Sequence, residues 1–127
     1  MSVSVVIVED DQDVREMLCY ALVSVGFDVT SLARLDPDSL ARHTSPQLFL
    51  IDLRLPGLDG VALAARLRAQ GFEDSAIVGM SASSVEVRRA LHAGLFEEVL
   101  PKPFDLSELV GCVERHTLPN QPSPVPS

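Results

Sequence analysis

The sequence predicts an α/β domain in which helices cover both faces of a five-stranded parallel sheet. Short β-branched or apolar runs alternate with segments of helical periodicity, and helical crossovers of this kind connect parallel strands. The chain has 127 residues, which is enough for one core and too few for a second of useful size. The predicted strands span residues 3–8, 28–32, 48–51, 76–80 and 97–100.

Five helices are predicted between and after these strands. The first carries an apolar stripe at helical spacing, which indicates one face packed on the sheet. The stripe consists of Val14, Met17, Leu18, Ala21, Leu22 and Val25. The other four are predicted from residues that favour helix N-termini. These are Asp36 before Pro37, Asp59 before Gly60, Ser83 with Glu86 three residues later, and Asp105 with Glu108 three residues later.

The composition is that of a globular domain. Apolar residues make up 46% and charged residues 22% of the chain, which excludes general disorder and a coiled coil. The net charge of -8 means that the chain lacks the basic surface needed to bind nucleic acid directly. The N-terminus shows neither a signal peptide nor a membrane span, so we expect a cytoplasmic protein without a membrane partner.

Cysteines and histidines occur only at isolated positions. Cys19 and Cys112 match neither a disulfide framework nor a CxxC spacing, which favours buried, unreactive thiols in a reducing compartment. His43, His92 and His116 form no catalytic triad and no metal-binding spacing. The sequence therefore gives no reason to assign these five residues a function.

The C-terminal segment 117–127 differs in composition from the rest of the chain. It has no charged residue and contains four of the nine prolines. Because proline interrupts helices and favours extended backbone, we expect a stiff linker or a flexible tail. The predicted domain therefore spans residues 1–116.

Three acidic residues follow two of the predicted strands. Glu9 and Asp10 come directly after the first strand, and Asp52 comes directly after the third. Ligands of open parallel sheets bind beyond the carboxyl ends of the strands, so adjacent first and third strands would bring these carboxylates together. Two carboxylates about 4 Å apart repel by about 4 kcal/mol at an effective dielectric near 20. A cation is therefore implied, and oxygen ligands suit Mg²⁺, with Mn²⁺ as an alternative.

Ser81 and Lys102 follow the fourth and fifth predicted strands. An aspartate beside a hard cation and a lysine can attack a phosphoryl group, because both positive charges neutralise the transferring oxygens. We therefore predict an aspartyl phosphate at Asp52, with Ser81 donating a hydrogen bond to the new phosphoryl oxygens.

Four segments resemble, in order and spacing, the signature blocks of the response-regulator receiver domain of two-component systems. They are residues 5–11, 52–60, 81–82 and 102–104. The resemblance extends over about residues 3–115 and implies a doubly wound, flavodoxin-like fold with strand order 2-1-3-4-5. It also implies a signalling module with at most autophosphorylation and autodephosphorylation activity, not an enzyme.

The same resemblance implies roles for individual residues. Asp52 would accept a phosphoryl group from a sensor histidine kinase or a histidine phosphotransfer protein. Glu9, Asp10 and Asp52 would hold Mg²⁺, with Glu9 acting through water. Ser81 and Lys102 would bind the phosphoryl oxygens.

Further positions follow from the family pattern. The backbone carbonyl of Arg54 would be a metal ligand, and the side chains of Arg54 and Ser83 would tune the lifetime of the phosphoryl group. Val99 stands where relatives commonly carry a Tyr or Phe. In relatives this ring swings inward on phosphorylation and is coupled to the residue at the Ser81 position, so here the switch would work without an aromatic ring. The peptide bond before Pro103 is typically cis in the family.

The resemblance also implies a partner surface. The helices that begin after Ser83 and Asp105, together with the fifth strand, would bind a downstream effector, an output domain or a second copy in a phosphorylation-linked homodimer. One alternative is the receiver of a transcription factor whose DNA-binding domain is absent here. Another is a haloacid-dehalogenase-type phosphatase, whose DxDx motif would need Thr or Val next, whereas Arg15 follows residues 11–14.

Overall fold

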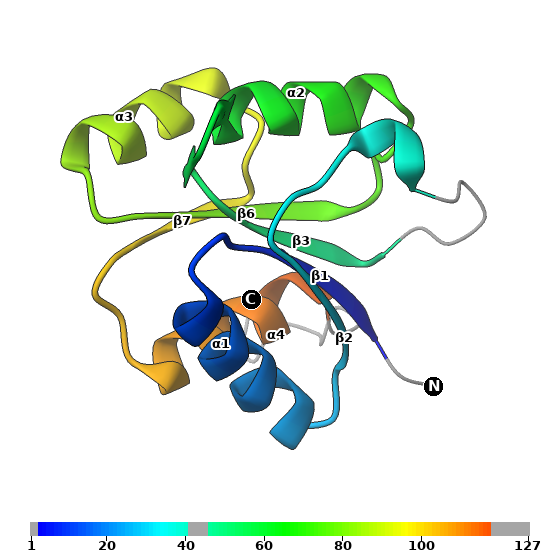
Figure 1. The fold of residues 1–127 in the computed structure, drawn as a ribbon, viewed down its shortest axis with the longest axis vertical. Coiled ribbons are helices and arrows are strands. Elements are labelled where there is room, and N and C mark those ends of the chain that lie inside the picture. Colours follow the sequence, from blue (N-terminus) through cyan, green and yellow to red (C-terminus); the bar gives the residue numbers. More distant parts are fainter. Residues whose placement is uncertain (1–2, 41–45, 118–127) are drawn as a thin grey trace, which may run out of the picture.

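The structure is a computed structural model that describes residues 3–40 and 46–117. These residues form a five-stranded sheet, a two-stranded hairpin, four α-helices and one 3₁₀ helix (Figure 1). In chain order the elements are β1 (Ser4–Val8), α1 (Gln12–Ser24), β2 (Asp28–Leu32), the 3₁₀ helix η1 (Pro37–Ser39), β3 (Leu48–Asp52), β4 (Arg54–Leu55), β5 (Leu58–Asp59), α2 (Gly60–Ala69), β6 (Ala76–Ser81), α3 (Ser84–Ala93), β7 (Glu98–Pro101) and α4 (Leu106–Thr117).

The main sheet is entirely parallel, with strand order β2-β1-β3-β6-β7. Because β6 and β7 are its fourth and fifth strands along the chain, the predicted order 2-1-3-4-5 is confirmed. Each strand begins and ends within one residue of its predicted bounds. Helices α1 and α4 cover one face of the sheet, and α2 and α3 cover the other (Figure 1). The strand order reverses between β1 and β3, which makes their carboxyl ends the expected ligand site.

The central strands are buried on both faces, which explains their almost continuously apolar sequences. Ile7, Leu50 and Val78 pack in one cluster with residues of α1 and α4. Phe49 and Ile51 belong to a second cluster with residues of α2. The sheet is thus held from both sides, and it provides a rigid base for the side chains at its carboxyl edge.

The second predicted helix is wrong in type, because the structure has a 3₁₀ helix and not an α-helix after Asp36. Only η1 forms after Asp36, so the described residues contain four α-helices and not five. Asp36 caps η1 as predicted, accepting a hydrogen bond from the backbone N–H of Asp38 at 3.0 Å. Pro37 is the one buried residue of the three, so this segment offers no apolar stripe that would stabilise a longer helix. Residues 41–45, which include His43, lie outside the described residues.

The first predicted helix is confirmed, but its buried stripe is narrower than expected. Leu18, Ala21 and Leu22 are buried, whereas Met17 and Val25 are 46% and 51% exposed. Val25 is exposed because it is the C-cap residue, beyond the last turn of α1.

The remaining predicted helices begin at the expected caps. Asp59, Ser83 and Asp105 accept hydrogen bonds from backbone N–H groups in the first turns of α2, α3 and α4. Helix α4 ends at Thr117, and the rest of the predicted tail lies outside the described residues. Across residues 3–40 and 46–117, no helix has both the length and the apolar character needed to cross a membrane.

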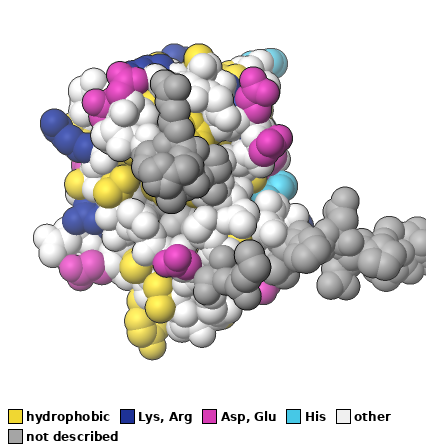
Figure 2. All heavy atoms as spheres, turned by 90° about the vertical axis from the view of Figure 1, so that its right-hand side faces the viewer, with side chains coloured by type: hydrophobic (Ala, Val, Ile, Leu, Met, Phe, Trp, Pro, Cys, Tyr) yellow, Lys and Arg dark blue, Asp and Glu magenta, His cyan; other side chains and the backbone are white. Residues whose placement is uncertain are grey.

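The two cysteines are free thiols, as expected. Cys112 is buried, but Cys19 is only partly buried, because it lies at the flank of the α1 stripe. On the uncovered part of the face in Figure 2, basic side chains are scattered singly among acidic and apolar ones.

A hairpin of β4 and β5 connects the end of β3 to α2. Gly57 in its turn has φ +69°, which a glycine adopts without strain. Gly60 then begins α2 so close to β3 that an added Cβ would lie 2.6 Å from Cα of Leu53 and 3.0 Å from the carbonyl oxygen of Asp52. The approach of α2 to the end of β3 therefore requires glycine at this position.

We expect Gly60→Ala to destabilise the protein by about 1–3 kcal/mol, because its methyl group would collide with backbone atoms. Gly111→Ala in α4 is the matched control. There an added Cβ would meet only the Arg115 side chain at 3.5 Å, an ordinary contact. This substitution should stabilise α4 by about 0.5–1 kcal/mol. Urea unfolding measures both changes, and the same sign for both would refute the packing explanation for Gly60.

Candidate functional site

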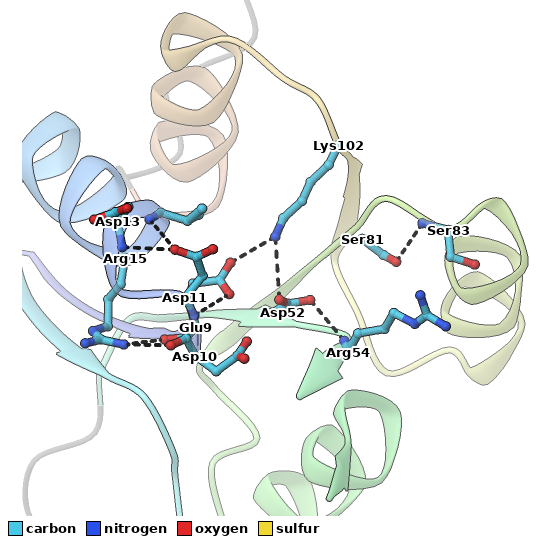
Figure 3. Close-up of polar contacts among 11 residues, drawn as sticks. Glu9, Asp10, Asp11, Asp13, Arg15, Asp52, Arg54, Ser81, Ser83 and Lys102 are labelled. Carbon is cyan, nitrogen blue, oxygen red and sulfur yellow. Dashed lines mark hydrogen bonds and ion pairs between the residues drawn. The ribbon is translucent and has the colours of Figure 1, made fainter. Parts of the chain in front are cut away.

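The predicted site residues lie together at the carboxyl edge of the sheet (Figure 3). Glu9 follows β1, Asp52 ends β3, and Lys102 follows β7. Neighbouring strands β1 and β3 place Glu9 and Asp52 side by side, and the long Lys102 side chain reaches across from the sheet edge. The site is therefore assembled by strand order from residues that are far apart in the chain.

Lys102 links the two buried carboxylates. Its Nζ lies 2.9 Å from Oε1 of Glu9 and 3.5 Å from Oδ2 of Asp52. Its backbone N–H donates to the carbonyl oxygen of Ser81 at 2.8 Å, which fixes the start of the loop after β7. The bond between Lys102 and Pro103 is cis, as the resemblance implied.

Glu9 is almost completely buried, with 1% of its surface exposed. Its second carboxylate oxygen accepts a hydrogen bond from the backbone N–H of Asp11 at 3.3 Å. The Arg15 guanidinium donates to the backbone carbonyls of Glu9 and Asp10 at 2.8 and 3.4 Å. Arg15 thus supports the loop that carries the acidic pair. No local pattern in the sequence predicts this role for Arg15.

Asp52 is 7% exposed, and its carboxylate lies between Lys102 and the backbone of Arg54 (Figure 3). Its Oδ1 accepts a hydrogen bond from the backbone N–H of Arg54 at 3.0 Å. Glu9, Asp10 and Asp52 each offer one carboxylate oxygen, and these three oxygens lie within 4.8 Å of one another. Three such oxygens, one of them on an exposed side chain, are a donor set that suits a partly hydrated Mg²⁺ ion.

Burial and charge shift the pKa values at this site. Burial raises the pKa of Glu9, although the hydrogen bond from Lys102 opposes the rise. For Lys102, burial disfavours the ammonium form, but the hydrogen bond to Glu9 and the charge of Asp52 outweigh it and raise the pKa. The ammonium group is therefore firmly charged, and one such charge faces three carboxyl groups. A bound cation would therefore improve the charge balance of the site.

Ser81 and Ser83 connect the site to α3. Ser81 ends β6, is 1% exposed, and its Oγ accepts a hydrogen bond from the backbone N–H of Ser83 at 3.0 Å. Ser83 in turn caps α3 by accepting from the backbone N–H of Glu86 at 3.3 Å. Val99 is buried on β7 in a small apolar cluster with Leu53 and Ala90. The serine pair therefore ties the end of β6 to the first turn of α3.

A surface pocket adjoins the acidic cluster, and two arginines contribute to its lining. Arg54 and Arg89 line it together with Asp10, Asp59 and apolar residues of the hairpin. Arg89 pairs with Asp59, and this hydrogen bond lowers the pKa of Asp59 despite partial burial. The sequence did not predict that Arg89 lines this pocket, because Arg89 lies on α3 and meets Arg54 of β4 only in the folded structure. Glu86 also lines the pocket and lies 3.7 Å from Arg89, so the charge of Arg89 is balanced by two carboxylates.

Comparison with known proteins identifies the same family that the sequence motifs resemble. Residues 5–114 match the family described as "Response regulator receiver domain". The transcriptional regulatory protein CseB of Streptomyces coelicolor is 38% identical over 114 residues, which cover 86% of this chain and 47% of CseB. The DNA-binding transcriptional regulator NtrC of Escherichia coli is 34% identical over 112 residues, which cover 86% of this chain and 24% of NtrC. The chain thus spans about half the length of CseB and about a quarter of NtrC.

Solved structures agree in fold. The chemotaxis protein CheY4 of Vibrio cholerae superposes with a TM-score of 0.80 at 21% identity, covering 91% of this chain and 99% of CheY4. A CheY-like receiver domain from Methylobacillus flagellatus gives a TM-score of 0.75 at 27% identity, covering 91% of this chain and 98% of the other. With a family match over 5–114 and the same fold, the chain belongs to the response-regulator receiver-domain family, whose members are signalling modules and not conventional enzymes.

Proposed function

We propose that Asp52 accepts a phosphoryl group from a phosphohistidine. The main support is the position of its carboxylate, which lies 3.5 Å from the Lys102 ammonium group and beside two further carboxylates at the switch point of the sheet. In the transfer, a carboxylate oxygen of Asp52 forms a bond to phosphorus. The P–N bond to the donor histidine breaks, and its electron pair stays on the imidazole nitrogen. Lys102 stabilises the negative charge on the transferring oxygens.

The residues around Asp52 fit a Mg²⁺ ion. Glu9, Asp10, Asp52 and the backbone carbonyl of Arg54 would hold it, with Glu9 acting through water; Mn²⁺ offers similar ligand chemistry. The ion, when bound, supplies positive charge to the transferring phosphoryl oxygens. Until then, the Lys102 ammonium group lies between Glu9 and Asp52 and offsets the repulsion between their carboxylates.

The hydroxyl of Ser81 would bind the phosphoryl oxygens and act as the switch residue. Its present hydrogen bond is to the backbone of Ser83, so redirecting Ser81 would loosen the start of α3. Val99 has no ring to move and packs against Leu53 and Ala90, so we propose that switching relies on the loop after Ser81. The side chains of Arg54 and Ser83 would tune the lifetime of the phosphoryl group. The activity of the chain itself would be limited to autophosphorylation and autodephosphorylation.

Receiver domains act with histidine kinases and with output domains. We propose a sensor histidine kinase or a histidine phosphotransfer protein as the donor for this chain. The surface of α3, β7 and α4 would bind the effector, the output domain or a second copy. Because CseB and NtrC are named as transcriptional regulators, transcription is the output we favour, with DNA bound outside residues 5–114.

The contacts of the two aspartates that would form its motif, Asp11 and Asp13, disfavour a haloacid-dehalogenase-type phosphatase. Asp11 accepts hydrogen bonds from the backbone N–H groups of Asp13 and Val14 at 3.0 and 3.2 Å, so it caps α1. Asp13 is exposed on the first turn of α1. Neither aspartate joins the carboxylates around Asp52.

The phosphoacceptor is tested with acetyl phosphate and Mg²⁺. Intact-protein mass spectrometry should detect the addition of one phosphoryl group. Asp52→Asn should abolish the addition, because an amide oxygen is a poor nucleophile and cannot form the mixed anhydride. Asp13→Asn, which changes an exposed acid on α1, should label normally. Labelling that persists in Asp52→Asn would place the acceptor elsewhere.

The metal assignment is tested by calorimetry with Mg²⁺ alone. Asp10 is exposed and the hydrogen bond recorded at this residue uses its backbone carbonyl, so Asp10→Asn should leave the fold intact. It should weaken Mg²⁺ binding by about tenfold or more, a loss of at least about 1.4 kcal/mol. Asp13→Asn serves again as the control for net charge. Equal affinities for Asp10→Asn and Asp13→Asn would remove Asp10 from the metal site.

A further inference from the structure

A second cluster of metal-ligating side chains lies at the opposite end of β7 from Lys102. Glu98 is the first residue of β7, and Cys112 and His116 lie on α4. Lys102 lies four positions after Glu98 along extended chain, a span of about 13 Å. The cluster is therefore separate from the carboxylates at the site of the proposed phosphorylation.

Local geometry brings the three side chains together. Cys112 and His116 are four residues apart, so they share one face of α4. One ligand atom each from Glu98, Cys112 and His116 lies within 4.8 Å of the other two. Nε2 of His116 is already 2.9 Å from Oε1 of Glu98. Neither helical residue stood out in the sequence, because the third ligand comes from a strand 14 positions before Cys112.

The ligand types select a particular kind of metal. Thiolate, imidazole and carboxylate are the ligands of Zn²⁺ in proteins, whereas Mg²⁺ prefers oxygen alone. Atoms bound to a tetrahedral Zn²⁺ lie about 3.3–3.7 Å apart. The His116 nitrogen and the Glu98 oxygen, now 2.9 Å apart, would therefore separate by about 0.5 Å, and the Cys112 sulfur would approach them by about 1.2 Å at most. We propose that Glu98, Cys112 and His116 form a Zn²⁺ site, with water as the fourth ligand.

Burial at the cluster suits such a site. The side chains of Glu98 and His116 are 28% and 23% exposed, so an ion can enter between them. Cys112 lies beneath them, fully buried between Leu109 and Val113 in the core cluster. A buried sulfur and two partly exposed ligands leave the fourth position facing solvent.

Binding exchanges a proton for the metal. Burial, aided by the charge of Glu98, raises the pKa of Cys112 to about 12, so the metal-free thiol is protonated at neutral pH. Zn²⁺ binding breaks the S–H bond, forms the S–Zn bond and releases the proton to solvent. Glu98 is already ionised: burial would raise its pKa, but hydrogen bonds from His116 and Arg115 outweigh burial and lower it.

Arg115 is the competing cation at this cluster. Its Nη2 lies 2.8 and 3.1 Å from the two carboxylate oxygens of Glu98. Its side chain is 59% exposed, and exposed ion pairs contribute little, so it can turn into solvent. Zn²⁺ with one thiolate and one carboxylate is electrically neutral, so Arg115 adds only an excess positive charge. Removing Arg115 should therefore strengthen metal binding. If the cluster were only an ion-pair network, removing Arg115 would instead weaken it.

The test uses Co²⁺ as a spectroscopic substitute for Zn²⁺, on the folded chain in excess Mg²⁺ so that the carboxylate site is occupied. One equivalent of Co²⁺ should produce a thiolate-to-cobalt charge-transfer band in the near ultraviolet. Zn²⁺ should displace the Co²⁺ and remove the band. An absent band, or a band that Zn²⁺ does not remove, would overturn the proposal.

Variants locate the ligands. Cys112→Ser and His116→Ala should each lose the band, whereas Cys19→Ser should keep it and Arg115→Ala should bind Co²⁺ more tightly. Because Cys112 lies in the core, circular dichroism checks that its variant is folded, and the partly exposed His116 gives an independent result. A band that survives in His116→Ala, that disappears in Cys19→Ser, or that weakens in Arg115→Ala would contradict the assignment. None of these variants touches Asp52, so phosphorylation by acetyl phosphate is scored separately.

Discussion

The ammonium group of Lys102 between two buried carboxylates is the interaction on which the site depends. Glu9 and Asp52 are 1% and 7% exposed, and neither charge would be tolerated at that depth without a counter-charge. Lys102 supplies that charge from the far strand of the sheet at 2.9 and 3.5 Å. The Asp52 carboxylate is therefore held in place by Lys102, while Asp10 remains at the surface, where a metal ion can reach it.

The sheet determines where each residue of this site lies. Parallel strands put Glu9, Asp52, Ser81 and Lys102 at one edge, and burial on both faces prevents a change of register. Gly60 shows how little freedom remains, since α2 begins in contact with the backbone of Leu53. The same packing that makes the core also fixes the distances at the site. A mutation in the core would therefore alter the chemistry without touching a functional side chain.

The strands and the acidic cluster were predictable from the sequence because both depend on local patterns. Apolar runs locate the strands to within one residue, and acids directly after such runs indicate the site. Features that depend on packing were not predictable. The segment after Asp36 has a good cap and a proline, yet it makes a single turn because it buries too little. Arg15 and Arg89 acquire their contacts only from the tertiary structure, and no local pattern distinguishes them from surface charges.

The replacement of an aromatic residue by Val99 changes how the edge strand can respond. Val99 is small, buried and packed against Leu53 and Ala90, and it has no aromatic ring that could swing inward. The backbone hydrogen bond from Lys102 to Ser81 at 2.8 Å extends the pairing of β6 with β7 and connects the end of β6 to the edge strand. A shift of Ser81 toward a phosphoryl group would act on β7 through this bond and would move the strand as a unit. Glu98 at the other end of β7 would then move relative to α4, which makes its contacts with His116 and Arg115 the point where such a movement is resisted or transmitted.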